Sequence, residues 1–319
     1  MYDIHVGDDC DQMNVANVPR MIFDNITNLI NIYLGDNVIN IDYGAFNNCQ
    51  SIVSVTGMKN VGAIGQAAFL QCINLESISL QDSNVQVILQ SAFMNCYKLK
   101  SVVLPNTFRQ FVGNAQFQHC YSLQSLIIPD EFEGNLSNNL CDMQPNTWYE
   151  NELENDGYIV SSLTHVYLGN SSSIGDQSFE GCDKLTTLEI PSSCQHIGDN
   201  AFYRCWNLTD ITFNEGLLAI DHGAFDNCKR LSSIHLPESL QSISQESFGD
   251  CDYLEEVYIG SGIQNIAFGV TEPSFCKHAA HVAFESKPIH FTINKPQGTF
   301  TDNMVEWAVP EGSYITWIG

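Results

Sequence analysis

The sequence predicts an α/β solenoid of about eleven coils of 23 residues, with a parallel β-sheet on one wall and short helical or 3₁₀ turns on the other. Three observations support this fold class. Phenylalanines recur at steps of 23 or 24 residues between Phe23 and Phe248, apart from one step of 62 residues. A cysteine follows most of them by three residues, and a leucine or isoleucine follows that cysteine by another three. Each repeat then continues as an alternating segment, L-x-x-I-x-L.

The full repeat reads I-G-x-x-A-F-x-x-C-x-x-L-x-x-I-x-L-P. A unit this short cannot enclose a hydrophobic core by itself, so we expect each coil to cover the apolar side chains of its neighbours. The last segment alternates apolar and polar residues, as in LTTLEIP (185–191), which is the period of a half-buried strand. The A-F-x-x-C segment predicts a short helical or 3₁₀ turn. Predicted strands begin at Leu29, Ile52, Leu75, Leu99, Leu123, Leu163, Leu185, Leu208, Leu231, Leu254 and Ala279.

This repeat resembles the 23-residue leucine-rich repeats of the BspA-like, or treponema-type, family over about residues 20–284, at its Ile, Ala-Phe, Cys and Leu positions. The resemblance implies a curved solenoid with the parallel sheet on its concave face. It also implies a protein-binding or adhesive role, since many family members are surface proteins of bacteria and parasitic protists. The family motif is structural, so the resemblance transfers no catalytic residues.

Departures from the period predict the domain organisation. Between Leu123 and Leu163 the step is 40 residues, and the additional segment is acidic and contains no Lys or Arg. We expect it to leave the coils as a loop, either as a recognition element with Trp148 and Tyr149 as anchors or as a solvated excursion without a partner. The predicted parts are an N-terminal cap (1–19), leucine-rich repeats (20–129), the acidic insertion loop (130–160), further repeats (161–284) and a C-terminal cap (285–319).

The charge of the chain excludes several classes of partner. Lys and Arg total 12 against 37 Asp and Glu, so the formal net charge of -25 repels nucleic acid and anionic lipid. The N-terminus shows no signal-peptide pattern, and no run approaches the roughly 20 apolar residues of a membrane span. We therefore expect neither nucleic-acid binding nor membrane insertion. The resemblance favours the cell surface or extracellular space, and the missing signal peptide favours the cytoplasm.

Twelve cysteines raise the question of disulfides. Nine of them, including Cys276, share one repeat position, so their side chains should form a column about 4.8 Å apart and parallel to one another. Disulfide geometry requires facing Cβ atoms, and a one-dimensional column cannot surround a tetrahedral metal ion. We therefore expect buried thiols. Cys10, Cys141 and Cys194 lie outside the column, and the sequence leaves their pairing open.

No catalytic or phosphate-binding motif occurs in the sequence, so we expect no enzyme, no cofactor and no metal site. The third and fifth positions of L-x-x-I-x-L point away from the core, and from His165 onward they carry His, Tyr, Glu and Asp. Such side chains on a rigid sheet suit recognition, although an ordinary solvated face has the same composition. The candidate partner-binding residues are His165, Tyr167, Glu189, Asp210, His235, Glu256 and Tyr258.

Two functional hypotheses follow. The first is a non-enzymatic protein-binding scaffold, an adhesin-like surface or secreted protein whose partner is a protein or glycoprotein. The second is an intracellular structural or scaffolding subunit of a protein assembly, which the missing signal peptide and the column of thiols favour. The sequence predicts neither the identity of the partner nor the oligomeric state.

Overall fold

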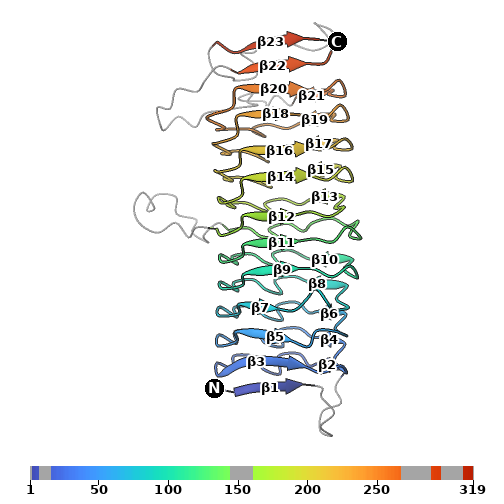
Figure 1. Cartoon of the computed structure of the whole chain (residues 1–319), viewed down its shortest axis with the longest axis vertical. Helices are drawn as coiled ribbons and strands as arrows, with labels where there is room; N and C mark the ends of the chain where they lie inside the picture. The colour runs from blue at the N-terminus through green and yellow to red at the C-terminus, as the bar shows by residue number, and fades with distance from the viewer. Residues whose placement is uncertain (1, 7–15, 144–160, 267–288, 296–311, 319) are drawn as a thin grey trace, which may run out of the picture. The chain divides into compact units, whose positions relative to one another are not determined.

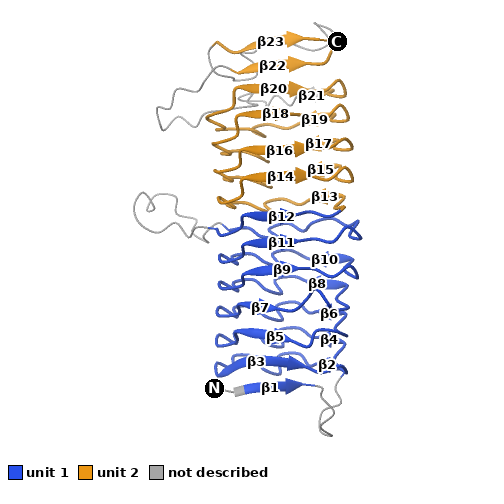
Figure 2. Cartoon of the chain, viewed as in Figure 1, with its two compact units in different colours: residues 1–169 blue, residues 170–319 orange. Residues whose placement is uncertain are grey.

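A computed structural model of the chain describes residues 2–6, 16–143, 161–266, 289–295 and 312–318 (Figure 1). The chain divides into two compact units, Met1–Gly169 and Asn170–Gly319 (Figure 2). Each unit consists of β-solenoid coils, and the units together supply about 11 turns with parallel sheets, as the repeat predicts. The buried residues of both units are dominated by the repeated Ile, Phe, Cys and Leu positions.

Unit 1 contains two kinds of strand, and every pairing between strands is parallel. The L-x-x-I-x-L segments form one kind: β1 (Tyr2–Val6), β3 (Leu29–Leu34), β5 (Ser54–Thr56) and β7 (Ser77–Ile78) in one sheet, and β9 (Ser101–Val103), β11 (Ser125–Ile127) and β12 (His165–Tyr167) in another. The second kind lies before the phenylalanine: β2 (Asn17–Val18), β4 (Asn40–Ile41), β6 (Ala63–Ile64), β8 (Val87–Leu89) and β10 (Gln110–Val112).

Unit 2 repeats this plan. Its strands of the first kind are β14 (Thr187–Ile190) and β16 (Asp210–Phe213), which pair together, and β18 (Ser233–His235), β20 (Glu256–Ile259), β22 (His290–Ile293) and β23 (Tyr314–Trp317), which form one sheet. Its strands of the second kind are β13 (Ser173–Ile174), β15 (His196–Ile197), β17 (Ala219–Ile220), β19 (Ser242–Ile243) and β21 (Asn265–Ile266).

The repeated phenylalanines form a stacked column inside each unit, and all described members except the half-buried Phe23 are buried. In unit 1 the rings from Phe23 to Phe117 follow one another at centroid distances of 5.2–5.4 Å and are nearly parallel. In unit 2 the rings from Phe179 to Phe248 stack at 5.2–5.3 Å. A ring in one coil therefore completes the apolar environment of the ring in the next, because adjacent coils are separated by about the spacing of paired strands.

The repeated cysteines satisfy the carbonyl groups of these phenylalanines. The carbonyl oxygen of Phe69, for example, accepts the N–H of Cys72 in its own coil and the S–H of Cys96 in the next coil, both at 3.2 Å. Equivalent S–H bonds of 2.9–3.5 Å are made by Cys49, Cys72, Cys120, Cys205, Cys228 and Cys251. Cysteine at this position thus fills the corner and supplies a weak donor that alanine lacks.

The predicted helical or 3₁₀ wall is not confirmed, because the described residues contain no helix and form consecutive turns there. In the coil of Phe69, the N–H groups of Ala68 and Leu70 donate three residues back, whereas those of Phe69 and Gln71 donate to the next coil. Ala67 (φ 55°) and Gln71 (φ 60°) are left-handed, and the same two positions are left-handed around each described repeat phenylalanine. Two left-handed residues four apart interrupt any helix, since a helix requires an unbroken right-handed series.

The register of one strand differs from the sequence alignment of the repeats. That alignment places Val112 at the inward Ile position, five residues before Phe117. In the structure Phe111 pairs with Ile88 and points inward, and Val112 is 41% exposed. The Phe111 ring is half-buried, and its packing against Phe108 at 4.7 Å and edge-on against Phe117 at 6.4 Å favours it over Val112 at the inward position.

Part of the predicted insertion continues the coils. Phe132 stacks on Phe108 at 5.5 Å, and Cys141 occupies the position that phenylalanine has in other coils. The N–H of Phe117 donates to the carbonyl of Leu140 just as other repeat phenylalanines donate to the residue before the next one. Residues 131–143 are therefore packed as solenoid.

Several sequence expectations fall partly or wholly on residues that the structure does not describe, among them those for Cys10 and Cys276. Residues 144–160, with Trp148 and Tyr149, lie outside the described part, so the loop there stays a prediction. The same holds for the strand predicted from Ala279. Within the predicted caps, β1 and β2 extend the sheets of unit 1, and β22 and β23 extend a sheet of unit 2, in parallel register.

Candidate binding surfaces

The predicted partner-binding residues are divided between the two units. His165 and Tyr167 lie on β12 of unit 1, and both are exposed. Tyr167 is oriented by its hydroxyl group, which donates to the Asp130 carboxylate at 2.5 Å. The sheet therefore presents one fixed aromatic ring at this edge, beside Ile127 on the neighbouring strand.

The two predicted acids of β14 and β16 are exposed but do not face one another. The strand register pairs Glu189 with Thr212 and Thr187 with Asp210. The carboxylate of Glu189 accepts a hydrogen bond from the side-chain amide of Asn214 at 3.2 Å. These two strands present separate acids rather than a carboxylate pair.

The remaining predicted residues, His235, Glu256 and Tyr258, lie on the sheet β18-β20-β22-β23, which carries two stacked pairs of rings in neighbouring columns. His235 and Tyr258 stack at 4.0 Å with an interplanar angle of 8°. On the next strands His290 and Tyr314 stack at 4.4 Å and 16°, and Glu256 lies 3.0 Å from Nδ1 of His290. We call the set His235, Glu256, Tyr258, His290 and Tyr314 the terminal aromatic face.

Hydrogen bonds hold one side of this face. The Glu238 carboxylate accepts the Tyr258 hydroxyl at 2.6 Å, the Ser261 N–H at 2.5 Å and the Asn294 amide at 3.0 Å. Hydrogen bonding from Ser261 and Tyr258 lowers the pKa of Glu238 to about 2, and the bond to Glu238 raises the pKa of Tyr258. Glu238 therefore stays ionised and anchors the tyrosine ring.

His290 and Tyr314 were missed from the sequence because they follow the last clear repeat. The signal was present, since IHFTI (289–293) and YITWI (314–318) alternate in the same way as the repeat strands. His290 is also fixed on its other side, with Nε2 2.9 Å from the Thr316 hydroxyl oxygen. The structure thus extends the predicted set by two strands.

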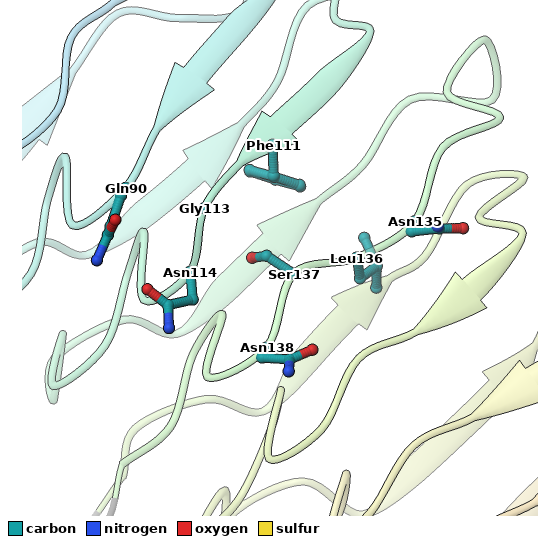
Figure 3. A pocket seen from close by; sticks show the side chains of 8 residues that line it. All are labelled: Gln90, Phe111, Gly113, Asn114, Asn135, Leu136, Ser137 and Asn138. Carbon is teal, nitrogen blue, oxygen red and sulfur yellow. The ribbon is translucent and has the colours of Figure 1, made fainter.

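Unit 1 contains a second candidate surface, a hollow of roughly 520 Å³ beside β8 and β10 (Figure 3). Gln90, Asn114 and Asn138 form a row along it, and Phe111, Ser137 and Leu136 lie behind this row. Gly113 and Asn135 complete the lining. The three amides occupy one repeat position, three residues before the phenylalanine or its substitute Cys141, a position that the sequence reasoning did not compare between coils.

Among the described residues, no group of three or more His, Cys, Asp or Glu side chains is arranged to hold a metal ion. No helix in the described part combines the length and hydrophobicity needed to cross a bilayer.

The stacked columns and parallel sheets define a leucine-rich repeat β-solenoid. Residues 16–141 and 151–273 match the family described as BspA type leucine rich repeat region, in 6 copies. This match covers well over half of the sequence, so the chain belongs to the BspA-type leucine-rich repeat family. A search of curated proteins found no match.

Among solved structures, the chain is similar to a leucine rich cell surface protein from Faecalibacterium prausnitzii, with 22% identity, 82% of this chain and 83% of that chain covered, and a TM-score of 0.43. A leucine-rich repeat protein from Bacteroides ovatus matches with 18% identity, 99% and 92% coverage, and a TM-score of 0.44. The pneumococcal vaccine antigen PcpA matches with 16% identity, 91% and 74% coverage, and a TM-score of 0.49.

Proposed function

We propose that this chain is a non-enzymatic protein-binding scaffold, acting as an adhesin-like surface or secreted protein whose partner is a protein or glycoprotein. Membership of the BspA-type family supports the binding role. The observation that carries the proposal is the terminal aromatic face, where two stacked His–Tyr pairs project from adjoining parallel strands.

Fixed aromatic rings suit protein recognition for a thermodynamic reason. Binding costs free energy when a mobile side chain must be ordered, and rings already held by stacking avoid part of that cost. Tyr258 is held by His235 and Glu238, and Tyr314 is held by His290 while remaining 55% exposed. Tyrosine also contributes both apolar area and a hydroxyl group, which is why it is enriched at binding hot spots.

The proposal is tested by exchanging the two tyrosines. Partners are captured from the native source with the whole chain, identified, and their affinities are measured for wild type and for Tyr258→Ala with Tyr314→Ala. We expect the double variant to weaken binding about ten-fold or more. Tyr97→Ala in unit 1 is the matched control, because Tyr97 is 42% exposed and stacks on Tyr121 but lies outside this face. Equal affinities for both variants would show that the face does not bind.

The second candidate function is an intracellular structural or scaffolding subunit. The buried thiols favour it, since Cys72, Cys96, Cys205 and Cys228 are free and a reducing compartment keeps cysteines in that form. Biotinylation of intact source cells separates the two functions. Labelling of the chain on intact cells supports the surface protein, and labelling only after lysis supports the subunit.

A further inference from the structure

The hollow of unit 1 is lined without any charged side chain. Its lining consists of carboxamides, a serine, a glycine and the apolar groups of Phe111 and Leu136. This is unusual for a chain with a formal net charge of -25. An ionic ligand would lack a counter-charge there, so the lining favours a neutral ligand with many hydrogen-bonding groups.

The amides along the hollow are spaced by the coils. The N–H of Ser91 donates to the carbonyl of Asn114 at 3.0 Å, and the N–H of Ala115 donates to the carbonyl of Asn138 at 3.0 Å. Gln90, Asn114 and Asn138 therefore succeed one another at about 4.8 Å, the separation of paired strands. Within the described part of the chain, the side-chain amides of Gln90 and Asn114 are exposed and make no hydrogen bond.

A glycine keeps the hollow open. Gly113 has φ of +79°, and a Cβ atom built there would lie 2.6 Å from Cβ of Gln90. Any side chain at this position would therefore displace Gln90 and fill the space beside Phe111. Phe111 is itself fixed by its contacts with Phe108 and Phe132, at 4.7 and 5.9 Å.

We propose that this hollow binds a neutral carbohydrate. A carboxamide both donates and accepts, as a sugar hydroxyl does, so Gln90 and Asn114 pair with ring hydroxyls. The half-buried Phe111 supplies the apolar surface on which the C–H face of a pyranose ring packs, and the buried Leu136 supports the hollow from below. The volume lies within the range of about 300–1,000 Å³ that is usual for small-ligand sites. This site belongs to unit 1 and does not depend on the terminal aromatic face of unit 2.

The experiment uses the whole chain and a defined panel of sugars. Neutral probes are maltotriose, cellotriose, mannotriose and the trimer of N-acetylglucosamine; the anionic probes are sialyllactose and a heparin tetrasaccharide; a neutral Gly-Ser hexapeptide is added. Saturation-transfer NMR detects binding and calorimetry gives Kd. We expect at least one neutral sugar to bind with Kd on the order of 0.1–5 mM, and the anionic sugars to bind more weakly.

Variants connect the binding to the hollow. Gln90→Ala with Asn114→Ala is expected to raise Kd about ten-fold or more, because it removes both carboxamides. Gln66→Ala is the matched control, since Gln66 has the same repeat position one coil earlier, is exposed and does not line the hollow. Its Kd should change less than about two-fold, and thermal unfolding confirms that both variants fold. The proposal would be overturned if no neutral sugar binds, if the double variant binds as tightly as the wild type, or if only the hexapeptide binds.

Discussion

At the residue scale, the buried thiols are defined by what surrounds them. Each described column cysteine is buried, and several donate to a phenylalanine carbonyl of the preceding coil. Burial raises the pKa of Cys49 to about 11 and raises the pKa of Cys72, Cys96 and Cys228 well above the usual value. The thiolate is the reactive form, so these positions are packing residues rather than nucleophiles.

Thiol labelling tests this interpretation. Native protein exposed to iodoacetamide at about pH 8 should leave Cys72, Cys96, Cys205 and Cys228 unmodified, because burial both hides the sulfur and raises the pKa of the thiol. The same cysteines should be alkylated within minutes in denaturant without any reductant. Mass spectrometry of the peptides reads out both states. Modification of the native protein, or a requirement for reductant after unfolding, would contradict the prediction.

Asp226 is a residue whose charge opposes folding. Burial, together with the nearby carboxylates of Asp250 and Glu246, raises the pKa of Asp226 from 3.8 to about 7. Between pH 3.8 and about pH 7 the folded protein therefore keeps a proton on Asp226 that the unfolded chain has already released. The stabilisation that this proton gives the folded state is fully present below pH 3.8 and is lost as the pH rises through about 7. Asp226→Asn should raise the free energy of unfolding by about 1–3 kcal/mol at about pH 8. Urea unfolding at about pH 4 should show little gain, and an equal gain at both pH values would show another cause.

At the element scale, the sequence predicted strands in which several apolar and polar residues alternate. It did not predict strands in which a single residue points inward. The L-x-x-I-x-L strands were predicted from three apolar positions each, and all described ones form. Strands such as Ala63–Ile64 have only two residues and one inward side chain, so no period was visible, and the second set of sheets was missed. The turns were predicted as helical because left-handed positions held by Ala67 or Gln71 carry no glycine signal.

The candidate surfaces were likewise predictable from the sequence only where they lie on the alternating strands. The sequence places His235 and Tyr258 at the same outward position of successive strands, and the strand register pairs them. His290 and Tyr314 lie beyond the last consensus repeat, so their place in that sheet depended on pairing that only the structure shows. The row of amides along the hollow was not predicted, because these residues lie in turns. Turns show no alternation of apolar and polar residues that would mark the exposed side.

Two glycines of one coil test the close packing between coils. Gly57 follows β5 with φ of +79°, and a Cβ atom there would lie 1.8 Å from the carbonyl oxygen of Leu34. Gly57→Ala should therefore lower the free energy of unfolding by about 3 kcal/mol or more, through the steric clash and the left-handed backbone. Gly62→Ala is the matched control, because its nearest atom would be 3.7 Å away. Chemical unfolding of both variants should separate them, and similar losses would refute the packing argument.

At the scale of the whole molecule, stability comes from contacts between neighbouring coils rather than from one central hydrophobic core. In each unit the phenylalanine rings, the thiols and the two sets of sheets connect one coil to the next, and the hydrogen bonds between coils repeat at that spacing. Repeat proteins built in this way behave as linear arrays with nearest-neighbour coupling. A destabilising substitution in one coil should therefore lower the local stability of a few neighbouring coils and leave that of more distant coils unchanged.

Phe93→Ala tests this coupling. Phe93 is fully buried and stacks on Phe69 at 5.3 Å and on Phe117 at 5.4 Å, so its removal breaks two stacks and should lower the free energy of local unfolding by about 3–5 kcal/mol. Hydrogen exchange measured by mass spectrometry should show lost protection in β6, β8 and β10, with little change in β17 and β19 of unit 2. Val112→Ala, an exposed change close to the same coils, serves as the control. A uniform loss of protection along the whole chain would show that the solenoid unfolds as one cooperative body and not as an array, because only a global transition lowers protection equally everywhere.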